Sequence, residues 1–111
     1  LQELGTIVQN KQPVKAIILN NNFLGMVRQW QQLFHERRYS FVELQNPDFV
    51  TIAKGFGMAG HTCNERESLS DSLDNLLNSD GPYLLEVIVE KEENVFPMVP
   101  AGASVAQIRL K

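Results

Sequence analysis

The sequence predicts an α/β fold with three layers, in which a mainly parallel sheet carries helices on both faces. Two observations support this. Strand-like and helix-like segments alternate in the order helix, strand, helix, helix, strand, helix, strand, which is typical of βαβ units with right-handed crossovers. Residues 14–19 are also nearly continuous in apolar side chains, as in a parallel strand covered on both faces. A chain of 111 residues is at most one domain.

The first helix and strand are predicted from hydrophobic spacing and a proline. Residues 1–8 read as a helix with one apolar face, and Pro13 closes it before the strand at residues 14–19. No capping residue precedes the helix and the sequence does not begin with methionine. We therefore expect the chain to be a piece of a longer protein. The apolar face of this helix carries Leu1, Leu4, Ile7 and Val8.

A second helix is predicted from about Gly25 to Arg37. At about 100° per residue, most of its apolar side chains fall within an arc of roughly 120°. We expect that arc to be buried and the polar residues outside it to face solvent. The arc contains Met26, Val27, Trp30, Leu33 and Phe34, whereas Arg28, Gln32, His35 and Glu36 lie outside it.

A loop at residues 39–45 precedes a third helix. Asn46 is expected to cap this helix, with Pro47 at its first position, and Gly57 is expected to end it. Residues 58–63 are a candidate strand. The apolar residues of the third helix are Phe49, Ile52, Ala53 and Phe56.

A fourth helix and a last strand complete the pattern. Residues 64–67 resemble a capping box in which Asn64 replaces Ser or Thr. Gly81 and Pro82 stop the helix, and residues 83–89 form the last strand. Residues 90–93 are predicted to be an exposed charged run, and residues 95–102 are too rich in proline for regular structure. The fourth helix is expected to bury Leu69, Leu73, Leu76 and Leu77.

The composition is that of an ordinary soluble globular protein, with 43% hydrophobic and 21% charged residues. The formal net charge of −3 gives no basic surface for nucleic acid or anionic membranes, and no apolar run approaches the ~20 residues that span a bilayer. We therefore expect neither a nucleic-acid partner nor a membrane partner. Cys63 is the only cysteine, so a reducing, cytoplasmic location is expected.

Three asparagines, Asn20, Asn21 and Asn22, lie between the first strand and the second helix. Such a turn can hold a metal-bound phosphate, because amide oxygens ligate hard cations and a helix N-terminus offers unpaired N–H groups. An asparagine run after a strand is more often a turn or a cap, so both interpretations remain at this point. The sequence has no glycine-rich phosphate loop, no Cys/His metal spacing and no nucleophile elbow.

Three segments have distinctive sequences: residues 14–30, which read VKAIILNNNFLGMVRQW, the Asn-Pro-Asp-Phe at 46–49 and the Phe-Pro-Met-Val-Pro-Ala-Gly at 96–102. Together they resemble the acetolactate synthase (acetohydroxyacid synthase) family, in its catalytic large subunit. The resemblance implies the C-terminal part of a thiamine-diphosphate-binding domain. Residues 1–94 would belong to that domain, and residues 95–111 would form a C-terminal tail.

The resemblance also implies which residues bind. The family's metal motif begins with Gly-Asp-Gly, which would lie upstream of Leu1, and ends at an Asn pair. Asn21 would then offer a side-chain oxygen to Mg²⁺ and Phe23 its backbone carbonyl. Gly25 and Met26 would lie at the cofactor thiamine diphosphate, and Met26 and Trp30 would line the substrate pocket. From spacing alone, Met26 and Trp30 are more often core residues than pocket residues.

The implied reaction is condensation of pyruvate with a second 2-oxo acid, pyruvate or 2-oxobutanoate, in branched-chain amino-acid biosynthesis. In the family, FAD binds a different domain and the glutamate that activates the cofactor comes from the partner subunit. We therefore expect no catalytic residue in this chain and no activity from it alone. The expected partners are 2-oxo acids, further copies of the full-length chain in a homodimer or homotetramer, and a small regulatory subunit.

Two alternatives stay open. The chain could belong to another thiamine-dependent 2-oxo acid carboligase or decarboxylase, or it could be a free-standing, non-catalytic α/β binding module in which the asparagine turn is structural. Residues 95–102 are a mobile end on sequence grounds alone, whereas the resemblance implies that they pack back near the active site. His35 is expected at the surface, and no catalytic role is expected for His61 or Cys63.

Overall fold

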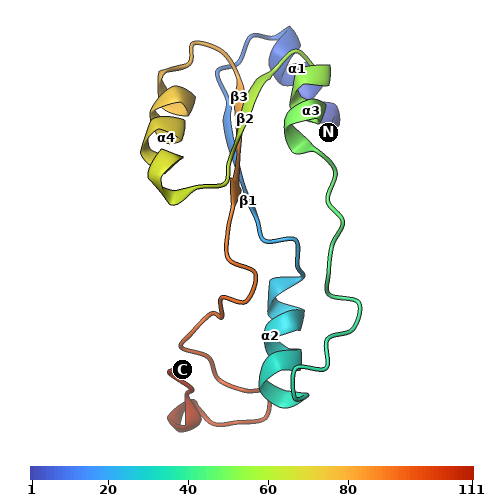
Figure 1. Cartoon of the computed structure of the whole chain (residues 1–111), viewed down its shortest axis with the longest axis vertical. Helices are drawn as coiled ribbons and strands as arrows, with labels where there is room; N and C mark the ends of the chain where they lie inside the picture. The colour runs from blue at the N-terminus through green and yellow to red at the C-terminus, as the bar shows by residue number, and fades with distance from the viewer. The chain divides into compact units, whose positions relative to one another are not determined.

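A computed structural model describes all 111 residues of the chain (Figure 1). Its contacts divide the chain into two compact units. The first, which we call the sheet unit, comprises Leu1–Asn22 and Gln45–Val89. The second, which we call the tail unit, comprises Phe23–Leu44 and Glu90–Lys111. The predicted division into residues 1–94 and 95–111 is a different one, and it stays a prediction.

The sheet unit is built around three parallel strands. They are β1 (Lys15–Asn20), β2 (Ala59–Cys63) and β3 (Tyr83–Ile88), in the order β1-β3-β2. Because all three run in the same direction, their carboxyl ends meet at one edge, where Asn20 pairs with Ile88 and Cys63 with Val87. The predicted parallel sheet is confirmed.

Helices cover both faces of this sheet, as predicted (Figure 1). On one face, α1 (Gln2–Gln9) and α3 (Phe49–Gly55) pack around a core. On the other face lies α4 (Leu69–Asn78), with a second core. Each fully buried leucine contributes about 1.5–3 kcal/mol to the free energy of unfolding. The buried members of the two cores are Ala53, Met58 and Leu84 on the first face, and Cys63, Leu76 and Leu85 on the second.

Gly60 on β2 lies close to the backbone of the neighbouring strand β3. A Cβ atom at Gly60 would lie 3.1 Å from the backbone oxygen of Leu84 and 3.6 Å from the Cβ of Ala53. The first distance is tighter than an ordinary contact and involves the backbone of β3, whereas the second is ordinary van der Waals contact. Glycine therefore fits this position without a shift of the neighbouring strand.

Four expectations about the sheet unit are wrong in detail. Leu77 is 66% exposed because it faces away from the sheet, and Leu19 is 70% exposed because β1 lies at the sheet edge with only one face covered. The third helix is capped by Asp48, whose carboxylate accepts the N–H of Thr51, and not by Asn46. The fourth helix begins after a 3₁₀ turn, η1 (Arg66–Ser68), so Asn64 makes no capping box.

The tail unit contains the helix α2 (Gly25–Phe34) and the last part of the chain. An antiparallel bridge pairs Phe23 with Glu43, and another pairs Met98 with Arg109. The tail is otherwise irregular, as predicted, except for the 3₁₀ turn η2 (Val105–Gln107). No helix of the structure has both the length and the apolar character that crossing a membrane requires.

Candidate functional site

The turn after β1 is shaped by the first of its three asparagines. The side-chain oxygen of Asn20 accepts the backbone N–H of Asn22 at 2.9 Å, which closes an Asx turn. Asn22 has a φ of +55°, in the left-handed region that asparagine tolerates better than most residues. The ladder between β1 and β3 continues up to this point, because the N–H of Val89 donates to the carbonyl of Asn20. The turn is therefore fixed by backbone and side-chain bonds together.

A buried carboxylate lies beside this turn, on the central strand. Glu86 is only 8% exposed, and its Oε1 accepts the side-chain N–H of Asn20 at 2.7 Å. Its Oε2 accepts the hydroxyl of Thr62 at 3.0 Å. All three strands thus contribute one polar side chain to a hydrogen-bonded chain across the sheet. The sequence reasoning missed Glu86, although an acidic residue within the apolar segment at residues 83–88 was the signal that could have found it.

Asn46 also joins this network, and its predicted role as a helix cap is wrong. Its side-chain N–H₂ donates to the Oδ1 of Asn20 at 2.8 Å and to the Oδ1 of Asn22 at 3.3 Å. The helix N-terminus two residues later is served by Asp48, which leaves Asn46 available to brace the turn. We refer to Glu86, Asn20, Asn22 and Asn46, with Thr62, as the turn network.

The two predicted metal ligands fall in different units, and each is described by itself. Asn21 is half-buried within the turn of the sheet unit, and Phe23 is half-buried at the start of the tail unit. A side-chain amide oxygen and a backbone carbonyl are hard donors, so this donor chemistry fits Mg²⁺ as part of a larger ligand set. No group of three or more His, Cys, Asp and Glu side chains that could hold a metal lies in the structure.

The other predicted site residues are brought together on α2. Gly25 is its first residue, and its N-terminus has no side-chain cap. Met26 is 55% exposed and lies one turn before Trp30, which is half-buried. The ring of Trp30 packs on Phe34 with 4.9 Å between ring centroids. The predicted burial of the apolar arc is wrong for its exposed members, which are Met26, Val27 and Phe34.

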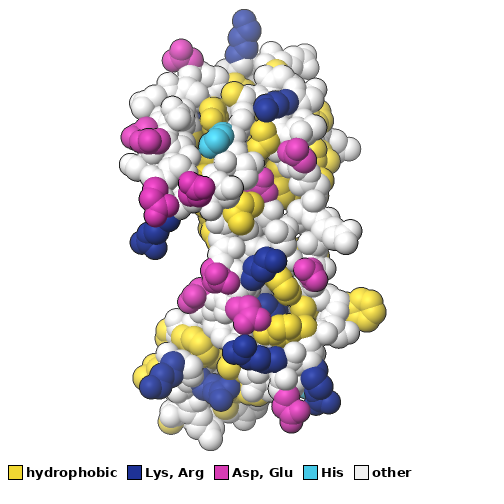
Figure 2. Space-filling model, in the orientation of Figure 1, with side chains coloured by type: hydrophobic (Ala, Val, Ile, Leu, Met, Phe, Trp, Pro, Cys, Tyr) yellow, Lys and Arg dark blue, Asp and Glu magenta, His cyan; other side chains and the backbone are white.

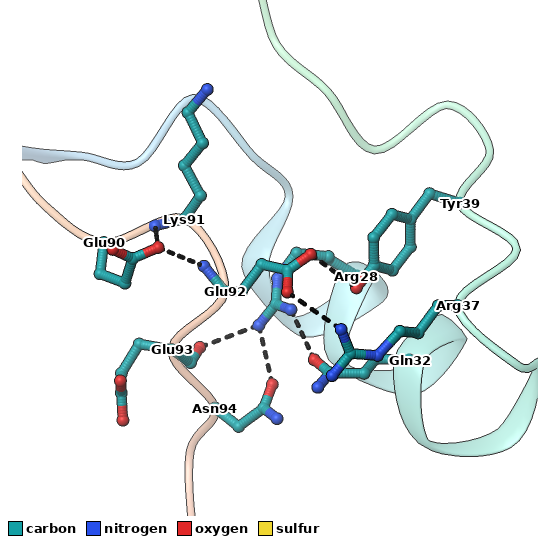
Figure 3. A network of polar contacts seen from close by, with 9 residues as sticks. All are labelled: Arg28, Gln32, Arg37, Tyr39, Glu90, Lys91, Glu92, Glu93 and Asn94. Atoms are coloured by element: carbon teal, nitrogen blue, oxygen red, sulfur yellow. Dashed lines mark hydrogen bonds and ion pairs between the residues drawn. The ribbon is translucent and has the colours of Figure 1, made fainter.

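Apolar side chains therefore remain at the surface among charged ones (Figure 2). The polar face of α2 is buried instead. Arg28, predicted to face solvent, is fully buried. Its guanidinium donates to Gln32 at 2.6 Å, to the carbonyl of Glu93 at 3.0 Å and to the side-chain oxygen of Asn94 at 2.7 Å (Figure 3). The Nε of Arg28 has no hydrogen-bond partner.

Gln29 attaches the tail to the same face of α2. Its Nε2 donates to the carbonyl of Val95 at 3.0 Å, and its Oε1 accepts the N–H of Val95 at 2.8 Å. The side-chain amide thus pairs with one residue's backbone as a neighbouring strand would. Nε2 also contacts the sulfur of Met98 at 3.2 Å. Residues 95–98 are consequently held against α2 and do not form a loose end.

The charged run at residues 90–93 is exposed, as predicted, and so is His35. Within this run, the carboxylate of Glu92 accepts the hydroxyl of Tyr39 at 3.1 Å and forms an ion pair with Arg37 at 3.5 Å (Figure 3). The pair is exposed on both sides, so its contribution to stability is small.

The chain is similar to acetolactate synthases along most of its length. It is 50% identical over 105 residues to the isozyme 2 large subunit of Escherichia coli (strain K12), covering 94% of this chain and 19% of that protein. It is 44% identical over 110 residues to the large subunit of Porphyra purpurea, covering 97% and 19%. The chain thus spans about a fifth of the length of these curated relatives.

A solved structure and a family match also relate the chain to thiamine-dependent enzymes. The thiamine diphosphate-dependent 4-hydroxybenzoylformate decarboxylase of Rhodococcus jostii RHA1 superposes with a TM-score of 0.70 at 30% identity, over 82% of this chain and 17% of that one. The family described as thiamine pyrophosphate enzyme, C-terminal TPP binding domain, matches residues 1–87. Because this match covers well over half of the sequence, the chain belongs to the thiamine pyrophosphate enzymes and carries residues of their C-terminal TPP-binding domain.

Proposed function

We propose that the chain is part of an acetolactate synthase large subunit, which condenses pyruvate with pyruvate or 2-oxobutanoate on thiamine diphosphate and Mg²⁺. The observation that carries the proposal is identity of 44–50% to acetolactate synthase large subunits over nearly the whole chain. The asparagine turn and α2 lie inside this matched region. The single cysteine supports a reducing, cytoplasmic location for the enzyme.

In this proposal, the side-chain oxygen of Asn21 and the backbone carbonyl of Phe23 would hold Mg²⁺, whose charge would favour binding of the cofactor's diphosphate. The uncapped N-terminus of α2 at Gly25 supports the binding of an anion, because its first N–H groups have no side-chain acceptor. When bound, thiamine diphosphate supplies the electron sink for decarboxylation and carbon–carbon bond formation. The residues of this chain bind and orient the cofactor.

Met26 and Trp30 form part of the substrate pocket in this proposal. The exposure of Met26 supports this, because a side chain that is 55% exposed is not committed to the core. The ring of Trp30 is anchored on one side by Phe34, and its other side can face a substrate. Replacing Trp30→Leu should lower the preference for 2-oxobutanoate over pyruvate, measured as the ratio of the two products in a competition assay.

The remaining parts of the enzyme lie outside these residues. We propose that the full-length chain assembles as a homodimer or homotetramer, binds FAD in another domain and takes the activating glutamate from a partner subunit. A small regulatory subunit would be a further partner. The 111-residue chain alone would then form no acetolactate from pyruvate, and detectable product from the purified chain would contradict this.

The test of the proposal uses the full-length protein that contains this chain. Replacing Asn21→Ala should weaken Mg²⁺-dependent binding of thiamine diphosphate, measured by calorimetry, and should lower acetolactate formation in parallel. The matched control is Asn75→Ala, at an exposed position of α4, which should change neither. Cofactor binding that is insensitive to Mg²⁺ or to Asn21→Ala would overturn the assignment of the turn.

A second candidate is another thiamine-dependent 2-oxo acid carboligase or decarboxylase. The structural similarity to a decarboxylase, with a TM-score of 0.70, supports it. Product analysis separates the two, because an acetolactate synthase releases a branched 2-hydroxy-3-oxo acid and a simple decarboxylase releases an aldehyde. A free-standing, non-catalytic module is disfavoured by the family match over residues 1–87.

A further inference from the structure

We propose that Glu86 is a positioning residue for the cofactor-binding turn, acting through Asn20 to hold Asn21 in the orientation that binds Mg²⁺. This inference rests on the proposed function, in which Asn21 is a metal ligand. Glu86 does not itself contact the metal in this proposal. It fixes the direction of the Asn20 side-chain amide, and that amide shapes the turn.

The hydrogen-bond chemistry of the turn network selects one orientation of the Asn20 amide. A carboxylate only accepts hydrogen bonds, so Glu86 requires the N–H₂ of Asn20 to point toward it, as the 2.7 Å contact shows. The oxygen of Asn20 then points the other way, where it accepts from the backbone N–H of Asn22 and from Asn46. With the amide flipped, an N–H₂ would face two donors and an oxygen would face a carboxylate.

A flip would therefore break three hydrogen bonds at once. Asn20 is 6% exposed and Glu86 is 8% exposed, so water cannot readily replace the lost partners. The N–H of Asn22 is one of those partners, and it belongs to the residue that follows Asn21. The direction of the Asn20 amide is thus coupled to the backbone on both sides of Asn21.

The burial of the Glu86 carboxylate also has to be compensated. The only ion pair in the structure joins Arg37 and Glu92, so the buried carboxylate of Glu86 has no cationic partner within the chain. Burial of a carboxylate without a cation is costly unless hydrogen bonds compensate, and an apolar residue would suit a central strand better. The donors Asn20 and Thr62 compensate for this burial, so the carboxylate is tied to the turn through Asn20.

Residues that orient metal ligands typically change metal affinity by about 10–100-fold when replaced. In the full-length protein, Glu86→Gln keeps the shape of the side chain but replaces a group that only accepts by one that can also donate, so only the N–H groups of Asn22 and Asn46 still select the direction of the Asn20 amide. We expect the Mg²⁺ concentration for half-maximal thiamine diphosphate binding, measured by calorimetry, to rise about tenfold or more. The melting temperature without Mg²⁺ and cofactor should change little.

Two further variants keep the test decisive. Glu67→Gln, the same replacement at an exposed site of η1, should leave Mg²⁺ affinity unchanged. Asn46→Ala removes the second donor to Asn20 from an exposed residue, so it should fold normally and weaken Mg²⁺ affinity in the same direction. If Glu86→Gln does not fold, Asn46→Ala decides the question.

The outcomes also separate this inference from the proposed function. If Asn21→Ala abolishes Mg²⁺-dependent cofactor binding while folded Glu86→Gln and Asn46→Ala bind as the unmodified protein does, the positioning role of Glu86 is overturned and the metal assignment stands. If Asn21→Ala has no effect on binding, the proposed function fails, and the role of Glu86 fails with it.

Discussion

The sheet unit and the helix α2 of the tail unit differ in the side chains that they bury most deeply. In the sheet unit, Leu76 and Leu85 are fully buried and the polar turn network lies at the carboxyl edge of the sheet. In the tail unit, the most buried side chains of α2 are Arg28 and Gln29, and more than a third of Met26 is exposed. Apolar packing thus dominates the sheet unit, whereas in the tail unit, which also buries Val42, hydrogen bonds hold the irregular backbone at residues 93–95 against α2.

The difference follows from what each unit has to satisfy. A parallel sheet satisfies its own backbone groups, so apolar side chains can cover it. The tail has no ladder, and its N–H and C=O groups need partners before they can be buried. Long polar side chains on α2 supply these partners: Gln29 pairs with Val95, and Arg28 donates to the carbonyl of Glu93.

The largest loss of stability on mutation is expected in the sheet unit. Replacing Leu85→Ala, at a position with no exposed surface, should lower the free energy of unfolding by about 2–5 kcal/mol, because it leaves a cavity between β3 and α4. Leu77→Ala is the matched control, since Leu77 is 66% exposed on α4, and it should cost less than about 0.5 kcal/mol. Denaturant unfolding of the full-length protein measures both, and equal effects would contradict the assignment of the core.

An intermediate loss of stability is expected in the tail unit. There, replacing a polar side chain of α2 should cost more than replacing an apolar one. Replacing Gln29→Ala leaves the backbone N–H and C=O of Val95 without their partners, which should cost about 1–3 kcal/mol. Val27→Ala on the same helix should cost little, because Val27 is 48% exposed. Hydrogen exchange at residue 95 should become faster in Gln29→Ala alone. If Val27→Ala lowered the free energy of unfolding more than Gln29→Ala does, the apolar arc of α2 would be its buried face after all.

The sequence was a good guide where side chains meet other side chains. Spacing predicted the strands, the helices and the layer order of the sheet unit, because leucines such as Leu76 and Leu85 pack into an apolar cluster. It was a poor guide to α2, where the partners of Arg28 and Gln29 are backbone groups some 65 residues later. No local pattern encodes a contact of that separation.

The residues of the candidate site also differ in whether the sequence could predict them. Asn21 and Phe23 were predicted from a resemblance and stay predictions, whereas the turn network was not predicted, because it joins residues from four separate segments of the chain. Asn46 was assigned to the wrong role for a local reason: Asn-Pro-Asp offers two capping residues, of which Asp48 caps the helix while Asn46 bonds to Asn20.

The smallest effect is expected at the cap of α3, and it should depend on pH. The backbone N–H of Thr51, and then its hydroxyl, donate to the carboxylate of Asp48 and hold its pKa below the ordinary value of 3.8. A carboxyl whose pKa is lower in the folded state stabilises the protein above the unfolded-state value, and this contribution is lost as the pH falls through the folded-state pKa. Asp48→Ala should therefore lower the melting temperature at neutral pH, and the difference from the unmodified protein should shrink below about pH 3.8.

Asp48→Asn separates the cap from the charge. An asparagine still accepts the N–H of Thr51, so most of the capping stabilisation should remain at neutral pH, but this residue no longer titrates. Melting temperatures of the three proteins between about pH 2 and 7 provide the test. If Asp48→Asn followed the pH dependence of the unmodified protein, the titrating group would lie elsewhere. If instead Asn46→Ala lowered the melting temperature as Asp48→Ala does, Asn46 would be the cap after all, and the turn network would lose a member.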